Sequence, residues 1–385
     1  MGLLLAAIVA GCRTTVEIEY DRPLPPGQLA LRKITDPNQF PDFTDAWFDL
    51  ESLKAATQNS LNYLGKPSSQ QFFPYGDINH DQAVKSLETF LTMVDSGVRP
   101  EELNGVIRAH FDVYMSVGYN DKGTVLFTGY YTPIFEGSYE QTRRFKYPLY
   151  KMPEDLVKSP DGQTLGRRDF DGQIISYPAR EAIEKSGMLD GQELVWLSDA
   201  FEVYIAHVQG SVKLRVPDGE LITVGYAANN GHEYGSVAKA LIDDKKIRSD
   251  RMSLATMIAY FKRHPKQVAR YTQRNPRFVF FQISEDETPH GSLNEPVIPM
   301  RTIATDKSIF PRACLAFIDT TLPRAGGTSA YKGFALDQDT GGAIRAPGRC
   351  DVYMGQGDEA GRLAGRTYQE GKLYYLFLKG SSPNL

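Results

Sequence analysis

Cysteine and histidine are scarce in this chain of 385 residues, which contains three cysteines and six histidines. No two cysteines are spaced as CxxC, and no pair of histidines forms an HExxH motif. Structural zinc sites and zinc hydrolases usually draw their ligands from such closely spaced residues. The sequence therefore argues against a zinc-stabilised domain and against a metal-dependent hydrolase, and we expect no cofactor.

Basic tracts and long apolar runs are also missing. The 43 lysines and arginines are outnumbered by 47 aspartates and glutamates, which gives a net charge of −4. Nucleic-acid-binding domains normally carry a basic patch or stripe, so nucleic acid is not the expected partner. No internal run approaches the roughly 18 apolar residues that a membrane-spanning helix requires. An internal transmembrane helix is therefore not expected.

A short apolar run opens the chain and ends at Val9-Ala10-Gly11-Cys12. The run has the length of the apolar core of a signal peptide, although no positively charged segment precedes it. Its end resembles a bacterial lipobox. We therefore predict a lipoprotein signal peptide over residues 1–11 and a lipid anchor on Cys12. Arg13, rather than Asp, follows the cysteine, which by analogy with bacterial lipoproteins favours the outer membrane and a protein that faces the periplasm.

The hydrophobic content of 41% and the charged content of 23% are typical of a globular protein. The length exceeds that of one ordinary core, which favours two domains. Residues 12–43 are rich in proline and predict an extended tether. Two amphipathic helices are expected to follow, one with Thr44 as N-cap and one with Asp81 as N-cap.

The character of the chain changes at about Pro133, where short strands, Gly/Pro turns and compact helices begin. After Asn275-Pro276 the pattern is almost entirely that of strands. It indicates a β-barrel with flanking helices that is interrupted by a β-rich insertion. The expected barrel domain comprises residues 44–132 and 276–385, and the expected inserted domain comprises residues 133–275.

Three aspartates stand at the ends of β-prone segments. Asp306 ends the apolar-leaning run Ile303-Ala304-Thr305, Asp339 lies where an apolar segment runs into Asp-Thr-Gly-Gly, and Asp351 opens Asp-Val-Tyr. Carboxylates at strand ends, beside glycines that let a substrate approach the backbone, are typical of acid/base sites. The arrangement predicts an enzyme that cleaves a sugar bond.

Two further runs precede the aspartates. The first is Phe127-Thr128-Gly129-Tyr130-Tyr131-Thr132-Pro133, and the second is His207-Val208-Gln209-Gly210-Ser211, followed by Asn230-Gly231-His232. Together with the trio of aspartates, which forms a "three-aspartate" module, these runs resemble the membrane-bound lytic murein transglycosylase A family. The resemblance spans roughly residues 40–380 and keeps the motifs in order.

The resemblance implies a mainly β fold with flanking helices. A double-psi β-barrel domain would be formed by both chain ends, with a smaller β-barrel domain inserted, and glycan strands of peptidoglycan would bind in the groove between them. The implied activity is that of a lytic exo- or endo-transglycosylase. The bond between MurNAc and GlcNAc breaks while the C6 hydroxyl of the same MurNAc closes on C1 to give a 1,6-anhydro ring. Asp351 matches the residue that acts as acid and then as base.

A single carboxyl group is chemically sufficient for this reaction. Ordinary glycosidases need a second one to activate water or to capture the sugar covalently. Here the substrate's own hydroxyl attacks, so the acid that has given up its proton can accept the next one. It must be protonated near neutral pH, which burial or a like-charged neighbour such as Asp339 can bring about. Asp339 could instead fix its own Thr-Gly-Gly turn, and we expect Asp306 to support the site.

Residues for substrate binding are carried over from the matching motifs, and most have a plainer structural explanation as well. The two tyrosines could be ordinary strand residues, the Gln-Gly-Ser run could be a helix C-cap, and the arginine, a cation suited to lactyl or peptide carboxylates, could be solvated. The candidates are Thr128, Tyr130, Tyr131, Thr132, Gln209, Gly210, Ser211, Asn230, Gly341, Gly342 and Arg345.

One segment departs from the family. Where the family commonly has a glycine in a turn, this chain has Pro311-Arg312-Ala313-Cys314, which puts the backbone of that turn in question. Cys314 and Cys350 could form a disulfide in an oxidising periplasm, or could be two buried free thiols.

Two other functions fit the same residues. One is a glycan hydrolase with two carboxylates, in which Asp351 is the acid and Asp339 or Asp306 serves the water. The other is a lipoprotein that binds peptidoglycan without cleaving it. In each case we expect a monomer, and wall-synthesis proteins remain open as partners.

Overall fold

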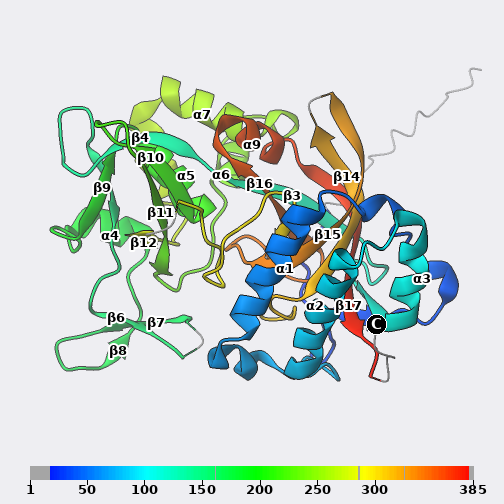
Figure 1. The fold of residues 1–385 in the computed structure, drawn as a ribbon. Helices are drawn as coiled ribbons and strands as arrows, with labels where there is room; N and C mark the ends of the chain where they lie inside the picture. Colours follow the sequence, from blue (N-terminus) through cyan, green and yellow to red (C-terminus); the bar gives the residue numbers. More distant parts are fainter. Residues whose placement is uncertain (1–17, 161, 285–286, 325, 381–385) are drawn as a thin grey trace, which may run out of the picture.

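The computed structural model describes residues 18–160, 162–284, 287–324 and 326–380, which form two lobes side by side (Figure 1). The two ends of the chain build one lobe and its middle builds the other. The predicted signal peptide (residues 1–11) and the predicted lipidation site Cys12 lie outside the described residues. Within the described part, no helix combines the length and the apolar character needed to cross a membrane.

A closed β-barrel forms the centre of the first lobe. Its six strands pair in the order β17-β14-β15-β13-β16-β3, and β3 pairs again with β17, which closes the ring. The pairs β13–β15 and β16–β3 are parallel. The strands are β3 (Val125–Thr132), β13 (Thr302–Ala304), β14 (Leu315–Arg324), β15 (Gly327–Asp339), β16 (Arg349–Gln356) and β17 (Tyr368–Leu378). This confirms the predicted mainly β fold with a double-psi-type barrel built from both chain ends.

Two short strands and four helices complete this lobe. Strands β2 (Phe111–Ser116) and β1 (Leu31–Lys33) extend the sheet beyond β17. Three helices pack beside the barrel (Figure 1) and bury apolar side chains such as Leu53, Leu87 and Leu103. The helices are α1 (Leu50–Leu64), α2 (His80–Asp95) and α3 (Pro100–His110), and a fourth, α9 (Gly357–Ala364), lies against β3 and β16.

Both predicted helix caps were wrong by a few residues. The Thr44 hydroxyl donates a hydrogen bond of 2.8 Å to Asp42 Oδ1 and is engaged in a 3-10 turn, so that α1 begins only at Leu50. The cap of α2 is Asn79, whose side chain accepts a hydrogen bond of 2.8 Å from the backbone of Gln82. Asp81 therefore lies in the first turn of α2, where the helix dipole stabilises a negatively charged carboxylate.

The second lobe is a six-stranded sheet with the order β12-β11-β10-β4-β9-β5. A bridge between Lys151 and Phe281 brings its two edges together. The strands are β4 (Ile134–Ser138), β5 (Tyr147–Tyr150), β9 (Glu193–Leu197), β10 (Ser211–Arg215), β11 (Leu221–Asn229) and β12 (Val279–Ile283). Its helices are α4 (Arg180–Ser186), α5 (Ala200–Gln209), α6 (Val237–Asp243), α7 (Leu254–Arg263) and α8 (Val268–Thr272). A separate sheet of β6 (Leu156–Lys158), β7 (Thr164–Arg168) and β8 (Ile174–Ile175) projects from this lobe (Figure 1).

Two predicted boundaries need correction. The inserted lobe does not end at residue 275, because β12 pairs with β11 and belongs to its sheet. The predicted tether of residues 12–43 is folded in its last part, since β1 pairs with β2 and the side chains of Ala30 and Phe43 are fully buried. The prediction of an extended tether rested on the proline content, which does not show that these apolar residues are buried in a core. The domain division is otherwise still a prediction.

A buried ion pair lies inside the barrel. The carboxylate of Asp337 is fully buried and forms an ion pair with Lys307. It also accepts hydrogen bonds of 2.7 Å from the hydroxyls of Thr305 and Tyr375. Burial lowers the pKa of Lys307, and the attraction of Asp337 opposes that shift. The carboxylate is thus satisfied by three side chains, two from the loop after β13 and one from β17, and it ties β15 to both segments.

The turn that departs from the family adopts the conformation that glycine favours. Ala313 has a φ of 61°, and its amide donates a hydrogen bond of 2.9 Å to the carbonyl of Asp337. An L-residue in this region is disfavoured by about 1–2 kcal/mol relative to the right-handed region, a cost that glycine does not have. The next residue, Cys314, and Cys350 are both buried free thiols, so the two cysteines do not form a disulfide.

The buried pair predicts a large difference between two lysine substitutions. Lys307→Met leaves the carboxylate of Asp337 buried without its cation and is expected to lower the free energy of unfolding by about 3–5 kcal/mol. The control is Lys239→Met, since Lys239 is 71% exposed and pairs at 3.5 Å with Asp243. There we expect about 0.5 kcal/mol or less. Urea denaturation at pH 7 measures both, and equal losses would contradict the proposed contribution of the buried pair.

Candidate active site

Strand register brings two of the three predicted aspartates into one row. Asp339 on β15 lies opposite Ala304 on β13, Ala304 lies opposite Asp351 on β16, and Asp351 lies opposite Thr128 on β3. Neighbouring strands are about 4.8 Å apart, so the backbones of the two aspartates are about 10 Å apart. The small side chain of Ala304 stands between them. The row therefore places two carboxyl groups on either side of one strand, with a small side chain between them.

The carboxyl group of Asp351 is held in a desolvated environment. Thr128 Oγ1 donates a hydrogen bond to its Oδ1 atom. Burial raises the pKa of Asp351, while the cation of Arg349 and the hydrogen bond from Thr128 act in the opposite direction, and the charge of Asp339 raises the pKa slightly further. The net effect is an upward shift of the pKa. The residue as a whole is nevertheless partly exposed.

Most of the hydrogen-bonding capacity of Asp339 is already used. Its Oδ2 atom accepts a bond of 2.9 Å from the Tyr130 hydroxyl, and Oδ1 accepts bonds of 2.8 Å from the backbone amides of Ser292 and Thr340. Burial raises the pKa of Asp339, and these donors oppose the shift. Asp339 thus fixes the turn that follows it and also acts as a charged neighbour of Asp351. The geometry combines both of the roles that the sequence left open.

Asp306 is buried away from this row. Its Oδ1 atom accepts bonds from the amide (3.1 Å) and the hydroxyl (2.6 Å) of Ser308, and Oδ2 accepts a bond of 2.9 Å from the amide of Ala346. The carboxylate therefore joins the loop after β13 to the loop before β16. Asp306 is 7% exposed, so its carboxylate is almost fully enclosed. Its contacts are those of a residue that sets the position of the strand carrying Asp351.

Two residues on β16 were missed by the sequence analysis although they flank Asp351 at the spacing of one strand face. Arg349 donates a long bond of 3.5 Å to Thr128 Oγ1, and its buried Nε atom has no hydrogen-bond partner among the described residues. On the other side, the Tyr353 ring lies 5.1 Å from that of Tyr130. Alternation along a strand was the signal that could have identified both.

The predicted binding residues at the junction of the lobes contact one another. The Thr132 hydroxyl lies 3.2 Å from Ser211 Oγ and 3.0 Å from the Tyr353 hydroxyl. The amide of Tyr131 donates a bond of 3.1 Å to Gln209 Oε1. Thr132 and Ser211 are both buried, so these bonds join β3 to the start of β10 and hold the lobes together.

Gly210 and Asn230 both have structural roles. Gly210 ends α5, and Asn230 is buried in the inserted lobe. Gly210 has a φ of 78° at the C-cap of α5, which supports the structural explanation of that motif. Asn230 is 2% exposed, and its side-chain amide donates to the carbonyls of Pro178 and Pro276 at 2.9 and 2.8 Å. Its oxygen accepts from the amide of Phe278 at 2.8 Å. Both donor hydrogens of the Asn230 amide are therefore engaged inside the inserted lobe, and its role in substrate binding stays a prediction.

The Asp-Thr-Gly-Gly turn faces the inserted lobe. Gly341 and Gly342 are partly exposed, and a Cβ atom on Gly342 would lie 3.0 Å from Arg277 Nε of that lobe. Arg345 is 42% exposed and lies 3.4 Å from a carboxylate oxygen of Glu233. These predicted binding residues line the space between the lobes rather than a core.

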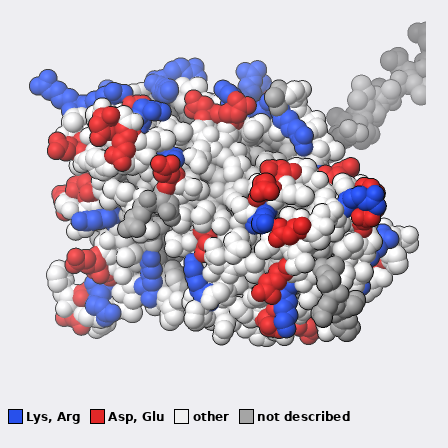
Figure 2. All heavy atoms as spheres, in the orientation of Figure 1, with Lys and Arg blue, Asp and Glu red and all other residues white. Residues whose placement is uncertain are grey.

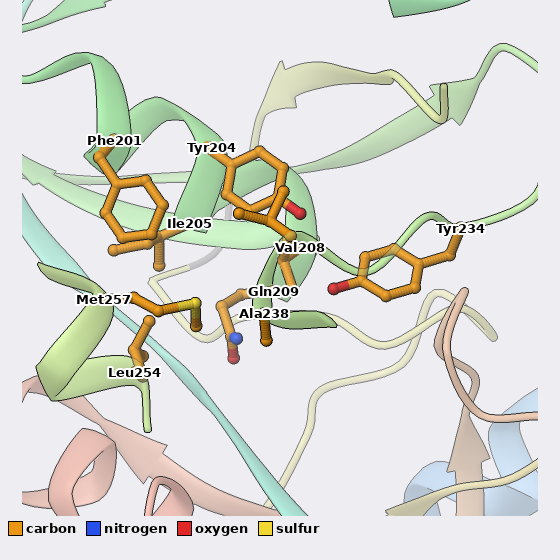
Figure 3. A pocket seen from close by; sticks show the side chains of 10 residues that line it. Phe201, Tyr204, Ile205, Val208, Gln209, Tyr234, Ala238, Leu254 and Met257 are labelled. Atoms are coloured by element: carbon orange, nitrogen blue, oxygen red, sulfur yellow. The ribbon is translucent and has the colours of Figure 1, made fainter. Parts of the chain in front are cut away.

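Few charged side chains lie on the visible face of the molecule between the lobes (Figure 2). Figure 2 shows charged side chains gathered over both lobes and a hollowed face between them that is largely free of charge. Beside it, α5, α6 and α7 enclose an apolar pocket of about 50 Å³ next to Gln209. Tyr234 directs its hydroxyl toward Val208 and Gln209 (Figure 3). Among the described residues, no group of three His, Cys, Asp or Glu side chains is placed to hold a metal ion.

Models of known protein families match segments of both lobes. The description "MltA specific insert domain" fits residues 126–282, and "3D domain" fits residues 301–377. Membrane-bound lytic murein transglycosylase A of Vibrio cholerae is 30% identical over 269 residues, or 69% of this chain and 68% of the relative. The chain belongs to the membrane-bound lytic murein transglycosylase A family. The resemblance seen in the sequence is thereby confirmed.

Solved structures of this family share the fold. The membrane-bound lytic murein transglycosylase from Agrobacterium tumefaciens has a TM-score of 0.75 and 25% identity, and covers 91% of this chain and 98% of its own. Escherichia coli MltA with bound chitohexaose has a TM-score of 0.69 and 23% identity, with coverage of 95% and 99%. The two-lobed arrangement described here is thus the arrangement of the family.

The position of Asp306 predicts a loss of stability after substitution. Asp306→Ala removes the acceptor for the amides of Ser308 and Ala346 in a buried site and is expected to lower the free energy of unfolding by about 2–4 kcal/mol. Urea denaturation measures the change. The control is Asp36→Ala, since Asp36 makes similar local bonds to Asn38 in an exposed turn. An Asp306 variant as stable as this control would contradict the structural role.

Proposed function

We propose that this protein is a lytic transglycosylase that cleaves the β-1,4 bond between MurNAc and GlcNAc in peptidoglycan. The proposal rests above all on the environment of Asp351, a partly exposed residue whose carboxyl pKa is raised by burial. The other two carboxylates, Asp339 and Asp306, each accept three hydrogen bonds from the protein. An ionised carboxylate accepts about four, so neither is well placed to activate water. A mechanism with one titrating carboxyl group fits best.

Asp351 carries out both proton transfers in the proposed reaction. In its protonated form it donates the proton to the glycosidic oxygen, and the bond from C1 of MurNAc to that oxygen breaks. The C6 hydroxyl of the same MurNAc then bonds to C1, and the carboxylate of Asp351 accepts the hydroxyl proton. The products are a free GlcNAc end and a 1,6-anhydro-MurNAc end, and Asp351 is again protonated. No water is consumed.

The neighbours of Asp351 have complementary roles in this scheme. Burial keeps the group protonated at a higher pH than an ordinary aspartate. Thr128 and Arg349 stabilise the carboxylate that exists between the two transfers. Asp339 and Tyr130 hold the turn of Gly341 and Gly342 beside the row. A sugar ring above Ala304 would contact both sides of this row.

The natural substrate is proposed to be a glycan strand of peptidoglycan in the space between the lobes. Chitohexaose is bound in the related Escherichia coli structure, and the mostly uncharged hollow of this chain suits such a polymer. We further propose that Cys12 carries a lipid that anchors the protein to the outer membrane, facing the periplasm. Family members described as membrane-bound support an attachment of this kind.

The reaction predicts the products of digestion and the effect of one substitution. Wild-type protein incubated with purified sacculi is expected to release anhydro-muropeptides, identified by mass spectrometry. Asp351→Asn keeps the shape of the side chain but cannot exchange the proton, so turnover is expected to fall by at least ~10²–10⁴-fold. Because Asp351 has a raised pKa in the folded state, wild-type stability declines as pH rises above the pKa of the unfolded chain. The Asn variant should therefore be at least as stable at pH 7.

Digestion in water enriched in oxygen-18 supplies the control. A hydrolase would place the heavy oxygen at C1 of the severed sugar, and a wall-binding protein without activity would release nothing. Heavy oxygen at C1, or an Asp351→Asn variant with undiminished turnover, would overturn the proposal.

The cation beside Asp351 predicts a shift in the pH profile. Turnover requires protonated Asp351 and is expected to fall as pH rises through its pKa. Arg349→Gln removes a cation that lowers this pKa. The alkaline limb of the kcat/KM profile should therefore shift to higher pH by about one unit. Arg349→Lys keeps the charge and should keep the limb near its wild-type position. A loss of activity that is equal at every pH would show a purely structural role.

A further inference from the structure

Arg277 is a half-buried cation without an anionic partner. It precedes β12 and reaches the space between the lobes, where its Nη1 atom donates a bond of 3.2 Å to the carbonyl of His232. Among the described residues, no carboxylate lies within ion-pair distance of this guanidinium. An arginine has five N–H donors in a planar fork. Most of the donors of Arg277 are therefore unused by the protein in a place where solvent is limited.

Arg277 touches the turn that follows Asp339. Its Nε and Cδ atoms lie at 3.0 and 3.1 Å from the position that a Cβ atom on Gly342 would occupy. Glycine at this position leaves room for the guanidinium, and any side chain would press on it. The cation is thus packed against the loop that begins at Asp339, only a few residues from the row of carboxyl groups.

A second arginine shares this space. Arg345 lies three residues after Gly342 and makes one weak contact of 3.4 Å to Glu233, whose side chain is 83% exposed. Such an exposed pair contributes little. Both arginines flank the same turn, since Arg277 packs at Gly342 and Arg345 follows it by three residues. Burial lowers the pKa of Arg277, the charge of Arg345 lowers it further, and Tyr226 and Glu233 act in the opposite direction. Two guanidinium groups so close together are stabilised by an anion between them.

Glycan backbones do not supply this anion, but the muramic acid sugar does. Its lactyl ether ends in a carboxylate, and when a stem peptide is attached there, the peptide carries carboxylates of its own. Chitohexaose, which consists of GlcNAc only, has neither. A guanidinium binds a carboxylate through two parallel hydrogen bonds with defined geometry, so such a site would also fix which sugar of the alternating strand lies beside Asp339.

We propose that Arg277 and Arg345 form a binding site for the carboxylate of the muramic acid substituent, either the lactyl group itself or the peptide attached to it. This inference rests on the proposed function and adds the group that sets the register of the strand. Arg277 supplies the buried part of the site, and Arg345 supplies the exposed part. Glu233 covers Arg345 in the free protein and is displaced by the stronger, two-cation contact.

Binding measurements in an inactive background test the site directly. The Asp351→Asn protein is titrated by calorimetry with three ligands: chitohexaose, MurNAc-GlcNAc strands stripped of peptide, and strands that keep their peptides. Arg277→Gln and Arg345→Gln are each added to this background. We expect about tenfold weaker binding of a carboxylate-bearing ligand for each substitution, and unchanged binding of chitohexaose. The loss should disappear at high salt, where screening weakens the wild-type contact.

Matched variants and the three ligands separate the outcomes. Arg248→Gln is the control, because Arg248 is an exposed arginine of the same lobe that pairs at 2.7 Å with Asp250, and it should change nothing. A loss with stripped strands identifies the lactyl carboxylate, and a loss only with peptide-bearing strands identifies the peptide. Equal weakening of all three ligands, or of none, would overturn the site. The proposed reaction is judged separately by the products of wild-type digestion, so either proposal can fail alone.

Discussion

The register of four neighbouring strands is the constraint on which the site depends. Asp339, Ala304, Asp351 and Thr128 come from four segments of the chain, and only the pairing of β15, β13, β16 and β3 places them in one row. A shift of one residue in any of these pairings would turn a side chain to the opposite face of the sheet. The buried bonds of Asp306 and Asp337 lock the loops between these strands. Asp306 and Asp337 therefore help to position the strands that carry the candidate site.

Asp337 and Asp351 are two carboxyl groups of the same barrel, and the protein compensates their charges to different extents. Asp337 is fully enclosed, and a lysine and two hydroxyls compensate its charge. Asp351 has a single hydrogen-bond donor and one neighbouring cation, Arg349, and burial outweighs both, so its pKa rises. Stability favours the first arrangement, whereas proton transfer requires the second. In the proposed mechanism, Asp351 is the carboxyl group that changes its charge, and its burial lowers stability.

Much of the fold could be predicted from the sequence, because alternating strands and the flanking helices leave clear periodic patterns. Motif order identified the family and, through it, the row of aspartates. Contacts that depend on the register between strands could not be predicted from the sequence. Nothing local shows that β12 pairs with β11, that Asn230 uses its whole amide inside a core, or that Arg277 meets Gly342. Arg349 was missed for a different reason, since its strand spacing from Asp351 was visible but was not used.

The closure of the barrel has a consequence for the life of the molecule in the cell. The ring is completed only when β17, the last strand of the chain, pairs with β3. A chain that is synthesised from its N-terminus therefore has an open, incomplete barrel until this segment is available. Asp351 precedes that segment and lies beside Thr128 in a closed ring only after β17 has paired with β3. The row of candidate catalytic residues is thus complete only when the barrel is complete.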